Sequence, residues 1–162
     1  MKDKDLFDYA RIERKIPASK ELKVSFELMA EQNDKGLLQI EFLDEDGTAC
    51  SRIELTAEGL MRTKGGARYG KNMDYEAHKT YQVEVQLSVA NRMVQVFIDG
   101  KKRGQRMFFA PVKSIERVMF RTGGQRTYPT VDTPADWYGI LDNAGEQEPE
   151  CTYRIAHFKT SS

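Results

Sequence analysis

The sequence predicts an all-β chain that folds as an antiparallel two-sheet β-sandwich. In most segments apolar and polar residues alternate with a period of two, which places the two kinds of side chain on opposite faces of a strand. Turn residues recur roughly every eight to twelve positions, as in sandwich domains. No segment keeps a helical period over enough residues for a stable helix. With 162 residues, the chain is expected to bury its core as a single domain spanning residues 1–162.

The clearest element is a β-hairpin at residues 81–100. Its first strand places five apolar residues on one face, namely Tyr81, Val83, Val85, Leu87 and Val89. Ala90-Asn91 reverses the chain, because Asn tolerates left-handed backbone, and the return strand ends at the turn dipeptide Asp99-Gly100. An isolated two-stranded ribbon is marginal in water. The hairpin therefore predicts a second sheet that covers its apolar face.

The preceding residues supply further strands separated by turns. The strands are expected at 9–16, ended by Pro17 and placed at a sheet edge, and at 22–30, 38–42, 52–57 and 60–64. Turns are expected at 33–36 and at Asp44–Gly47. No period holds from Ala67 to Lys79, so this segment is interpreted as a loop or a poorly regular crossing.

After the hairpin the pattern weakens. Residues 101–104 are expected to form a basic turn, 106–109 a short strand, 114–121 a strand and 151–160 the closing strand. Between them, residues 123–150 lose all periodicity and contain three of the five prolines and the single Trp. A long irregular segment of this kind in a compact domain is usually functional, so it is interpreted as a binding loop.

Composition limits the environment and partners. Lys+Arg and Asp+Glu both number 25, so no whole-molecule field attracts nucleic acid or anionic membrane. No apolar run is long enough to span a bilayer, and the first residues do not form a signal peptide. We expect an extracellular or periplasmic module cut from a longer precursor, with a cytosolic protein as the alternative. Cys50 and Cys151 fit no zinc pattern and form either a disulfide or two separate buried thiols.

Three stretches together resemble the concanavalin A-like lectin/glucanase and laminin-G-like jelly-roll superfamily. They are LKVSFELMAEQNDKGLLQIEFLDEDG, TYQVEVQLSVANRMVQVFIDGKKRG and SIERVMFRTGG. The resemblance covers roughly residues 9–124 and the last strand. It implies a jelly-roll sandwich and a carbohydrate-binding or accessory module of a bacterial polysaccharide-degrading protein. Function must still be argued from a site.

Catalytic signatures of this superfamily are incomplete. A retaining glucanase needs paired carboxylates on one strand face. In IEFLDED, however, Glu41 is followed by Leu43, and Asp44 lies on the opposite face or in the turn. A lyase on an acidic glycan would use Arg121, Arg126 and a Tyr or His, but His78 and His157 are isolated. A small jelly-roll lyase or hydrolase is therefore the alternative, and a structural or protein-interaction domain is the other.

The predicted ligand site lies at the irregular loop, where aromatic rings would contact the C–H face of a sugar and polar groups its hydroxyls. Its residues are Trp137, Tyr138, Tyr128, Arg121, Arg126 and Asp136. The alternative is that Trp137 plugs the end of the sandwich. The expected partner is an oligo- or polysaccharide, acidic in one version, together with the catalytic domain of a larger parent chain.

A second candidate surface is a polar strand face. It comprises Gln82, Glu84, Gln86 and Gln95, flanked by Arg62, Lys64 and Arg117, and its alternative interpretation is a solvated outer face. No cofactor and no metal ligand is assigned. A structural Ca²⁺ would fit the carboxylates of residues 132–142 or of Asp44–Asp46.

Overall fold

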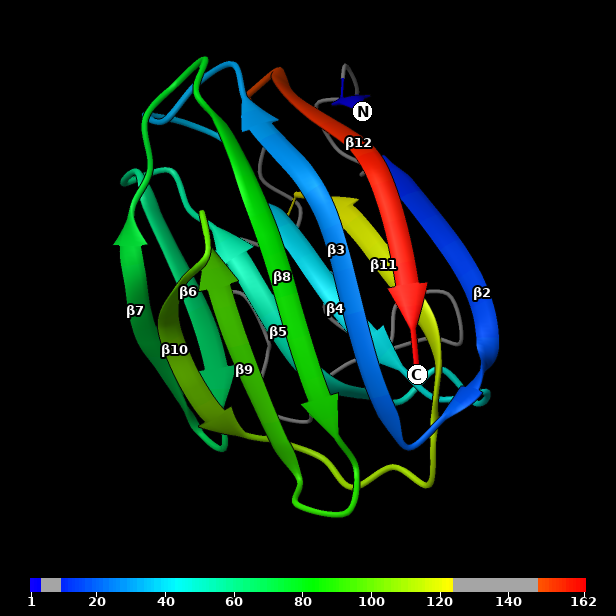
Figure 1. The fold of residues 1–162 in the computed structure, drawn as a ribbon. Coiled ribbons are helices and arrows are strands. Elements are labelled where there is room, and N and C mark those ends of the chain that lie inside the picture. Colours follow the sequence, from blue (N-terminus) through cyan, green and yellow to red (C-terminus); the bar gives the residue numbers. More distant parts are fainter. Residues whose placement is uncertain (4–9, 124–148) are drawn as a thin grey trace.

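The computed structural model describes residues 1–3, 10–123 and 149–162, and these residues form two antiparallel six-stranded sheets packed face to face (Figure 1). The sheet nearer the viewer, here the front sheet, contains in spatial order β1 (Lys2–Asp3), β12 (Cys151–Ser161), β3 (Glu21–Ala30), β8 (Thr80–Ser88), β9 (Met93–Ile98) and β10 (Lys101–Met107). The other, the back sheet, contains β2 (Arg11–Ser19), β11 (Ile115–Thr122), β4 (Leu38–Leu43), β5 (Ala49–Leu55), β6 (Leu60–Gly65) and β7 (Arg68–Asp74). The predicted two-sheet sandwich is confirmed.

The space between the sheets holds one apolar core, built from alternate residues of the central strands. The front sheet contributes Leu22, Val24, Phe26, Leu28, Tyr81, Val83, Val85, Leu87, Val94, Val96 and Ile98. The back sheet contributes Leu38, Ile40, Phe42, Ile53, Leu55, Val118 and Phe120. Burying one such side chain stabilises the fold by about 1.5–3 kcal/mol. The strands with the clearest alternation in the sequence are therefore those that hold the two layers together.

The reversal after β9 differs from the expected basic turn. Asp99 and Gly100 both adopt left-handed backbone, with φ of 51° and 74°, so two residues complete the turn. Pairing resumes at once, with Lys101 opposite Ile98, and β10 continues to Met107 with one irregularity at Lys102–Gly104. The predicted turn at 101–104 is wrong, because a two-residue turn leaves these residues free to pair.

The reversal before β9 also differs in detail. Its left-handed residue is Arg92, with φ of 50°, and not Asn91. The hairpin itself is confirmed, since β8 and β9 pair from Val83–Ile98 to Ser88–Met93. The sequence therefore located the turn correctly but assigned the unusual backbone to the wrong residue.

The expected loop or irregular crossing at 67–79 is wrong for Arg68–Asp74, which forms β7 and pairs with β6, whereas residues 75–79 belong to no strand. None of the β7 residues is fully buried. An edge strand with both faces partly exposed has no hydrophobic alternation, so periodicity could not reveal it.

The first long strand does not end at Pro17. β2 runs to Ser19, and its ladder with β11 is interrupted between the pairs Lys15–Arg117 and Ser19–Ile115, so Pro17 lies in the interruption. A proline is tolerated there because no ladder hydrogen bond needs its missing N–H. The predicted position at a sheet edge is confirmed.

Cys50 and Cys151 are both buried thiols, so of the two alternatives the separate thiols are confirmed and the disulfide is wrong. Burial raises the pKa of the Cys50 thiol. Among the residues that the structure describes, none belongs to a helix that could cross a membrane.

Candidate functional site

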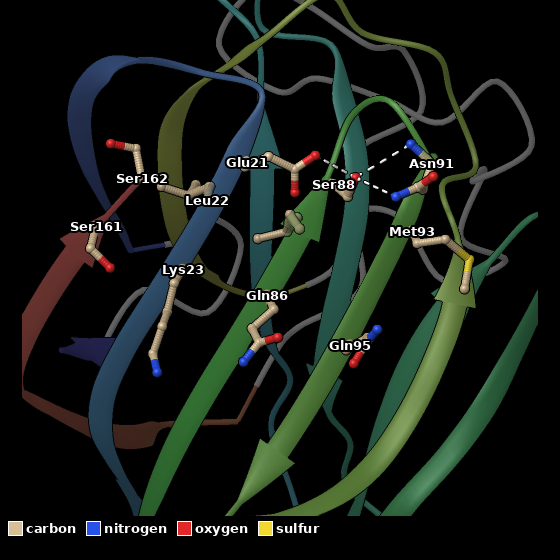
Figure 2. A pocket seen from close by; sticks show the side chains of 11 residues that line it. Glu21, Leu22, Lys23, Gln86, Ser88, Asn91, Met93, Gln95, Ser161 and Ser162 are labelled. Atoms are coloured by element: carbon tan, nitrogen blue, oxygen red, sulfur yellow. Dashed lines mark hydrogen bonds between the residues drawn. The ribbon is translucent and has the colours of Figure 1, made fainter.

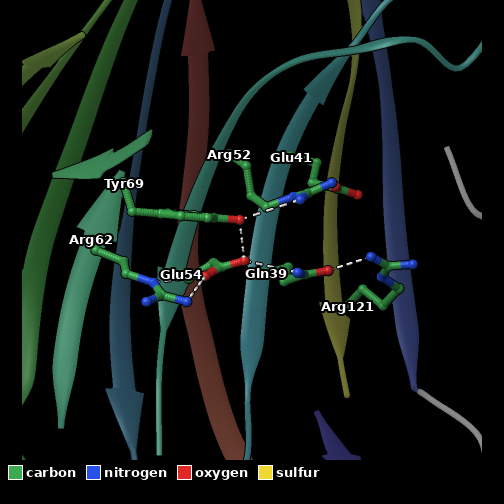
Figure 3. Close-up of polar contacts among 7 residues, drawn as sticks. All are labelled: Gln39, Glu41, Arg52, Glu54, Arg62, Tyr69 and Arg121. Atoms are coloured by element: carbon green, nitrogen blue, oxygen red, sulfur yellow. Dashed lines mark hydrogen bonds and ion pairs between the residues drawn. The ribbon is translucent and has the colours of Figure 1, made fainter. Parts of the chain in front are cut away.

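A group of polar side chains covers the outer face of the back sheet, on the side away from the apolar core (Figure 3). It contains Gln39 and Glu41 of β4, Arg52 and Glu54 of β5, Arg62 and Lys64 of β6, Tyr69 of β7 and Arg121 of β11. We call these eight residues the back-sheet cluster. Six of them are buried, and only Arg62 and Tyr69 reach solvent.

Strand register brings the cluster together. Glu54 lies between Gln39 on β4 and Arg62 on β6, and one step along the sheet Arg52 lies between Glu41 and Lys64. Directly opposed residues in an antiparallel pair stand on the same face with their side chains in reach. Residues separated by more than twenty positions in the chain therefore form one network.

Glu54 is the centre of this network. Its Oε1 accepts hydrogen bonds from Gln39 Nε2 at 2.9 Å and from the Tyr69 hydroxyl at 2.8 Å. Its Oε2 accepts from Arg62 through Nε at 2.9 Å and Nη2 at 2.8 Å. An ionised carboxylate has about four acceptor positions, and all of them are used. Glu54 therefore fixes the orientation of both residues that reach solvent.

A buried ion pair lies beside Glu54. Arg52 contacts Glu41 Oε1 through Nε at 2.7 Å and Nη2 at 2.5 Å, with side chains 3% and 0% exposed. Arg52 also donates to the Tyr69 hydroxyl at 3.4 Å. Arg121 Nη2 donates to Gln39 Oε1 at the deepest end. A network buried in this way keeps its side chains rigid, because moving one of them would leave its partner without a hydrogen bond in a place that water does not reach.

The open end of the cluster is formed by Tyr69 and Arg62. Tyr69 is 37% exposed, and the side chain of Arg62 is 36% exposed. The Arg62 guanidinium lies over the Tyr69 ring, 4.2 Å from its centroid. Lys71, paired at 2.7 Å with Asp74, provides an exposed cation on the same strand as the ring. An aromatic surface beside a held guanidinium is suited to a ligand that has an apolar face and an anionic group.

Tyr69 and Lys64 are among the cluster residues whose pKa is shifted. Burial, together with repulsion by Glu54, raises the pKa of Tyr69 to about 12. Burial and the nearby Arg52 lower the pKa of Lys64. The Tyr69 hydroxyl therefore remains protonated at neutral pH and continues to donate to Glu54.

The pKa of Tyr69 predicts a specific alkaline instability. An unfolded tyrosine loses its proton near pH 10, whereas folded Tyr69 keeps it to about pH 12. Its contribution to stability is therefore complete below pH 10 and is lost as the pH rises through about 12. We expect Tyr69→Phe to show a smaller fall in unfolding free energy over this interval in urea titrations. Parallel curves for the two proteins would contradict this assignment.

The predicted loop site is only partly described. Trp137, Tyr138, Tyr128, Arg126 and Asp136 lie outside the described residues, so their assignment stays a prediction. Arg121 is described, and it lies within β11 rather than in a loop, with no exposed surface. Its guanidinium donates a hydrogen bond to the side chain of Gln39 and is not exposed to solvent.

The predicted second surface is wrong as a single surface, because its members lie on two different sheets. Gln82, Glu84, Gln86 and Gln95 belong to β8 and β9 of the front sheet. The flanking cations Arg62, Lys64 and Arg117 belong to β6 and β11 of the back sheet. Arg62 and Lys64 instead complete the back-sheet cluster.

Two of the carboxylates considered for catalysis or calcium, Glu41 and Asp44, have structural partners, whereas those of residues 132–142 lie outside the described residues. Glu41 is held in its ion pair with Arg52. Asp44 caps the predicted turn, where its Oδ1 accepts from the Thr48 N–H at 2.8 Å. His157 lies 3.0 Å from Glu27 on the front sheet. The described part of the chain holds no group of three or more His, Cys, Asp or Glu side chains placed to bind a metal ion.

Most of the back-sheet cluster was not identified from the sequence. The available signal was that three consecutive strands each carry two polar residues at alternate positions. These are Gln39 and Glu41, Arg52 and Glu54, and Arg62 and Lys64. Complementary charges on neighbouring strands favour cross-strand pairs. Using this signal requires the register, which the sequence does not fix directly.

Comparison with known proteins places this chain in a family. The family model described as "Sialidase-like, CBM domain", a carbohydrate-binding module, matches residues 1–137. A protein described as "Sialidase" is 64% identical over 99% of this chain, with a TM-score of 0.87, and the chain spans 15% of that protein. No curated protein sequence matched.

More distant structures share the fold. Chicken galectin 2 has 8% identity and a TM-score of 0.61, with 94% of this chain and all of that chain covered. Trypanosoma rangeli sialidase has 14% identity and a TM-score of 0.54, with 86% of this chain and 20% of that chain covered. At these identities the likeness shows the architecture alone.

The sandwich is therefore a lectin-like module of the jelly-roll, concanavalin A-like class, as its sequence resemblance implied. The chain belongs to the sialidase-like carbohydrate-binding module family. Its function is that of a non-catalytic carbohydrate-binding accessory module, which is the leading prediction made from the sequence.

Proposed function

We propose that the module binds an acidic glycan, of the sialylated class, at the open end of the back-sheet cluster. The observation that carries this proposal is the pair formed by Tyr69 and Arg62, which is partly exposed while Glu54 fixes both side chains from beneath. The very similar protein described as a sialidase supports a sialylated ligand.

The chemistry of the open end fits a sugar acid. The part of the Tyr69 ring that Arg62 leaves exposed offers an apolar surface to the C–H face of a pyranose, and the guanidinium of Arg62 and the ammonium of Lys71 can pair with a carboxylate. Because Glu54 already holds Arg62 and Tyr69 in place, little side-chain freedom is lost on binding. Glu54 itself is shielded below them, which limits its repulsion of an anionic ligand.

The small share of the similar sialidase that this chain covers supports a role inside a longer protein. Since the chain spans 15% of the similar sialidase, we propose that it stands beside a catalytic domain in a longer parent protein. The location outside the cytoplasm remains the expectation drawn from the sequence. Binding a glycan at the module raises the effective concentration of neighbouring substrate at a tethered catalytic domain. For this role the module has to bind the glycan, and the reaction itself takes place at the catalytic domain.

The test is calorimetric titration of the chain with 3′-sialyllactose and with lactose. We expect binding of the sialylated sugar only, and a loss of about tenfold to a hundredfold in affinity for Arg62→Ala, since a charge-assisted hydrogen bond would be removed. Arg154→Ala is the matched control, because Arg154 is an exposed arginine paired with Glu31 on the front sheet. Equal binding of the two sugars, or equal affinity of the two variants, would refute the proposal.

A further inference from the structure

The outer face of the front sheet has a hollow that the back-sheet cluster does not involve (Figure 2). Its volume is about 760 Å³, which lies within the usual range of about 300–1,000 Å³ for ligand sites. It is lined by amides and hydroxyls, by the ammonium of Lys23 and the carboxylate of Glu21, and by apolar side chains such as Met93. The two sheets separate this hollow from Tyr69 and Arg62.

The polar side chains of the hollow form a row across the strands. In the strand register Lys23 on β3 lies opposite Gln86 on β8, Gln86 opposite Gln95 on β9, and Gln95 opposite Gln105 on β10, which continues the row beyond the hollow. Neighbouring strands are about 4.8 Å apart, so the row spans about 14 Å in equal steps. A pyranose unit in an extended glycan repeats on a similar scale. A linear glycan lying across the strands would therefore meet about one polar side chain for each sugar.

Part of this row is available to a ligand. The side-chain amide of Gln95 makes no hydrogen bond to any described residue, and Gln86 uses only its Nε2, which donates to Glu84 at 2.8 Å. An amide presents both donors and an acceptor, which is what a sugar hydroxyl requires. These two amides therefore offer unused hydrogen-bonding groups next to each other, as Figure 2 shows.

The charged groups beside the row are paired with neighbouring side chains and include one more carboxylate than cation. Lys23 pairs with Glu84 at 2.7 Å, and Glu21 accepts a 2.6 Å hydrogen bond from Ser88. One cation thus lies with two carboxylates near the hollow, an arrangement that gives an anion no net attraction. In contrast to the open end of the back-sheet cluster, this surface favours a neutral ligand.

Apolar groups flank the amides on the same face. Along β9, Met93 and Phe97 lie on either side of Gln95 and are partly exposed. Met107 of β10, paired with Met93, is 61% exposed. Alternating amide and apolar surface matches the hydroxyl edges and C–H faces of a sugar chain. A protein interface would instead place its apolar groups at the centre and its polar groups at the rim.

From this arrangement we infer a second carbohydrate site, in which a linear neutral oligosaccharide lies across β3, β8, β9 and β10 on the amides of Gln86 and Gln95. The module is then bivalent, with sites on opposite faces for an acidic sugar and for a neutral chain. Simultaneous binding of two parts of one glycan layer would exceed the affinity of either site alone. This inference holds whether or not the acidic site is confirmed.

The test uses a neutral hexasaccharide of N-acetyllactosamine repeats, titrated into the chain by calorimetry and followed by backbone amide NMR shifts. We expect shifts on β8 and β9, and an affinity about tenfold weaker for the double variant Gln86→Ala and Gln95→Ala, since two hydrogen-bonding amides are removed. Binding of 3′-sialyllactose should not change in this variant.

Gln82→Ala is the matched control, because Gln82 lies on the same strand but outside the hollow, where its amide donates to Glu27 at 2.7 Å. It should keep full affinity for the hexasaccharide. No binding by the native chain, or equal affinity of the double variant and the control, would overturn the inference. So would sedimentation showing self-association that the double variant abolishes, because this face would then be an interface between two copies.

Discussion

Replacing Arg52 by alanine is expected to lower the free energy of unfolding by about 3–5 kcal/mol, because it leaves a buried carboxylate without its counter-ion. Glu41 has no exposed surface, and both contacts of the ion pair, at 2.7 and 2.5 Å, come from Arg52. Chemical denaturation of the purified variant measures the loss. Since the Tyr69 hydroxyl also receives a hydrogen bond from Arg52, the open end of the cluster should loosen as well.

Two controls separate the burial of charge from the loss of a contact. Lys71→Ala breaks a 2.7 Å ion pair whose side chains are 56% and 71% exposed, and should cost less than about 1 kcal/mol. The double change Glu41→Leu with Arg52→Met removes both charges and should recover most of the loss, since apolar residues of similar volume replace a buried pair well. A double variant as unstable as Arg52→Ala would contradict this explanation.

Gly36→Ala is expected to destabilise the fold by about 2–5 kcal/mol, through two additive effects. Gly36 has a φ of 77°, and a side chain in left-handed backbone costs about 1–2 kcal/mol. An added Cβ would also lie 2.7 Å from Cys151 Cβ and 3.0 Å from the Tyr153 hydroxyl, and overpacking of this kind costs about 1–3 kcal/mol. Thermal and urea denaturation would both report it.

Gly66→Ala isolates the backbone effect. Gly66 also has a positive φ, of 55°, but an added Cβ would meet nothing within 4 Å. This variant should lose only about 1–2 kcal/mol. If both substitutions lowered stability equally, contact with the closing strand would play no part, and the packing of the Gly36 turn against β12 would be refuted.

The sequence predicted most strands because an apolar face must be buried and a period of two shows which residues share it. Leu22 to Ala30 and Tyr81 to Leu87 follow this rule, and their apolar members lie in the core. Where neither face is buried, as in β7, the same rule gives no signal. The extension of β2 past Pro17 depended on an interrupted ladder, which a residue pattern does not reveal.

The candidate site was harder to predict for a different reason. Each cluster residue, taken alone, resembles a solvated polar position on the outer face of a strand. Glu54 becomes the centre of a network only when β4 and β6 lie on either side of β5 and Tyr69 reaches over from β7. Conversely, Gln86 and Arg62 were grouped from the sequence but lie on opposite sheets.

By itself the sequence determined the class of fold and the membership of the core, because hydrophobic alternation is a local pattern that burial enforces. Tertiary structure alone decided which polar side chains meet. Strand order and register set the distances between residues far apart in the chain, and electrostatic and hydrogen-bond energies depend on those distances and on exclusion of water. The ion pair of Glu41 with Arg52 and the held ring of Tyr69 are consequences of that pairing.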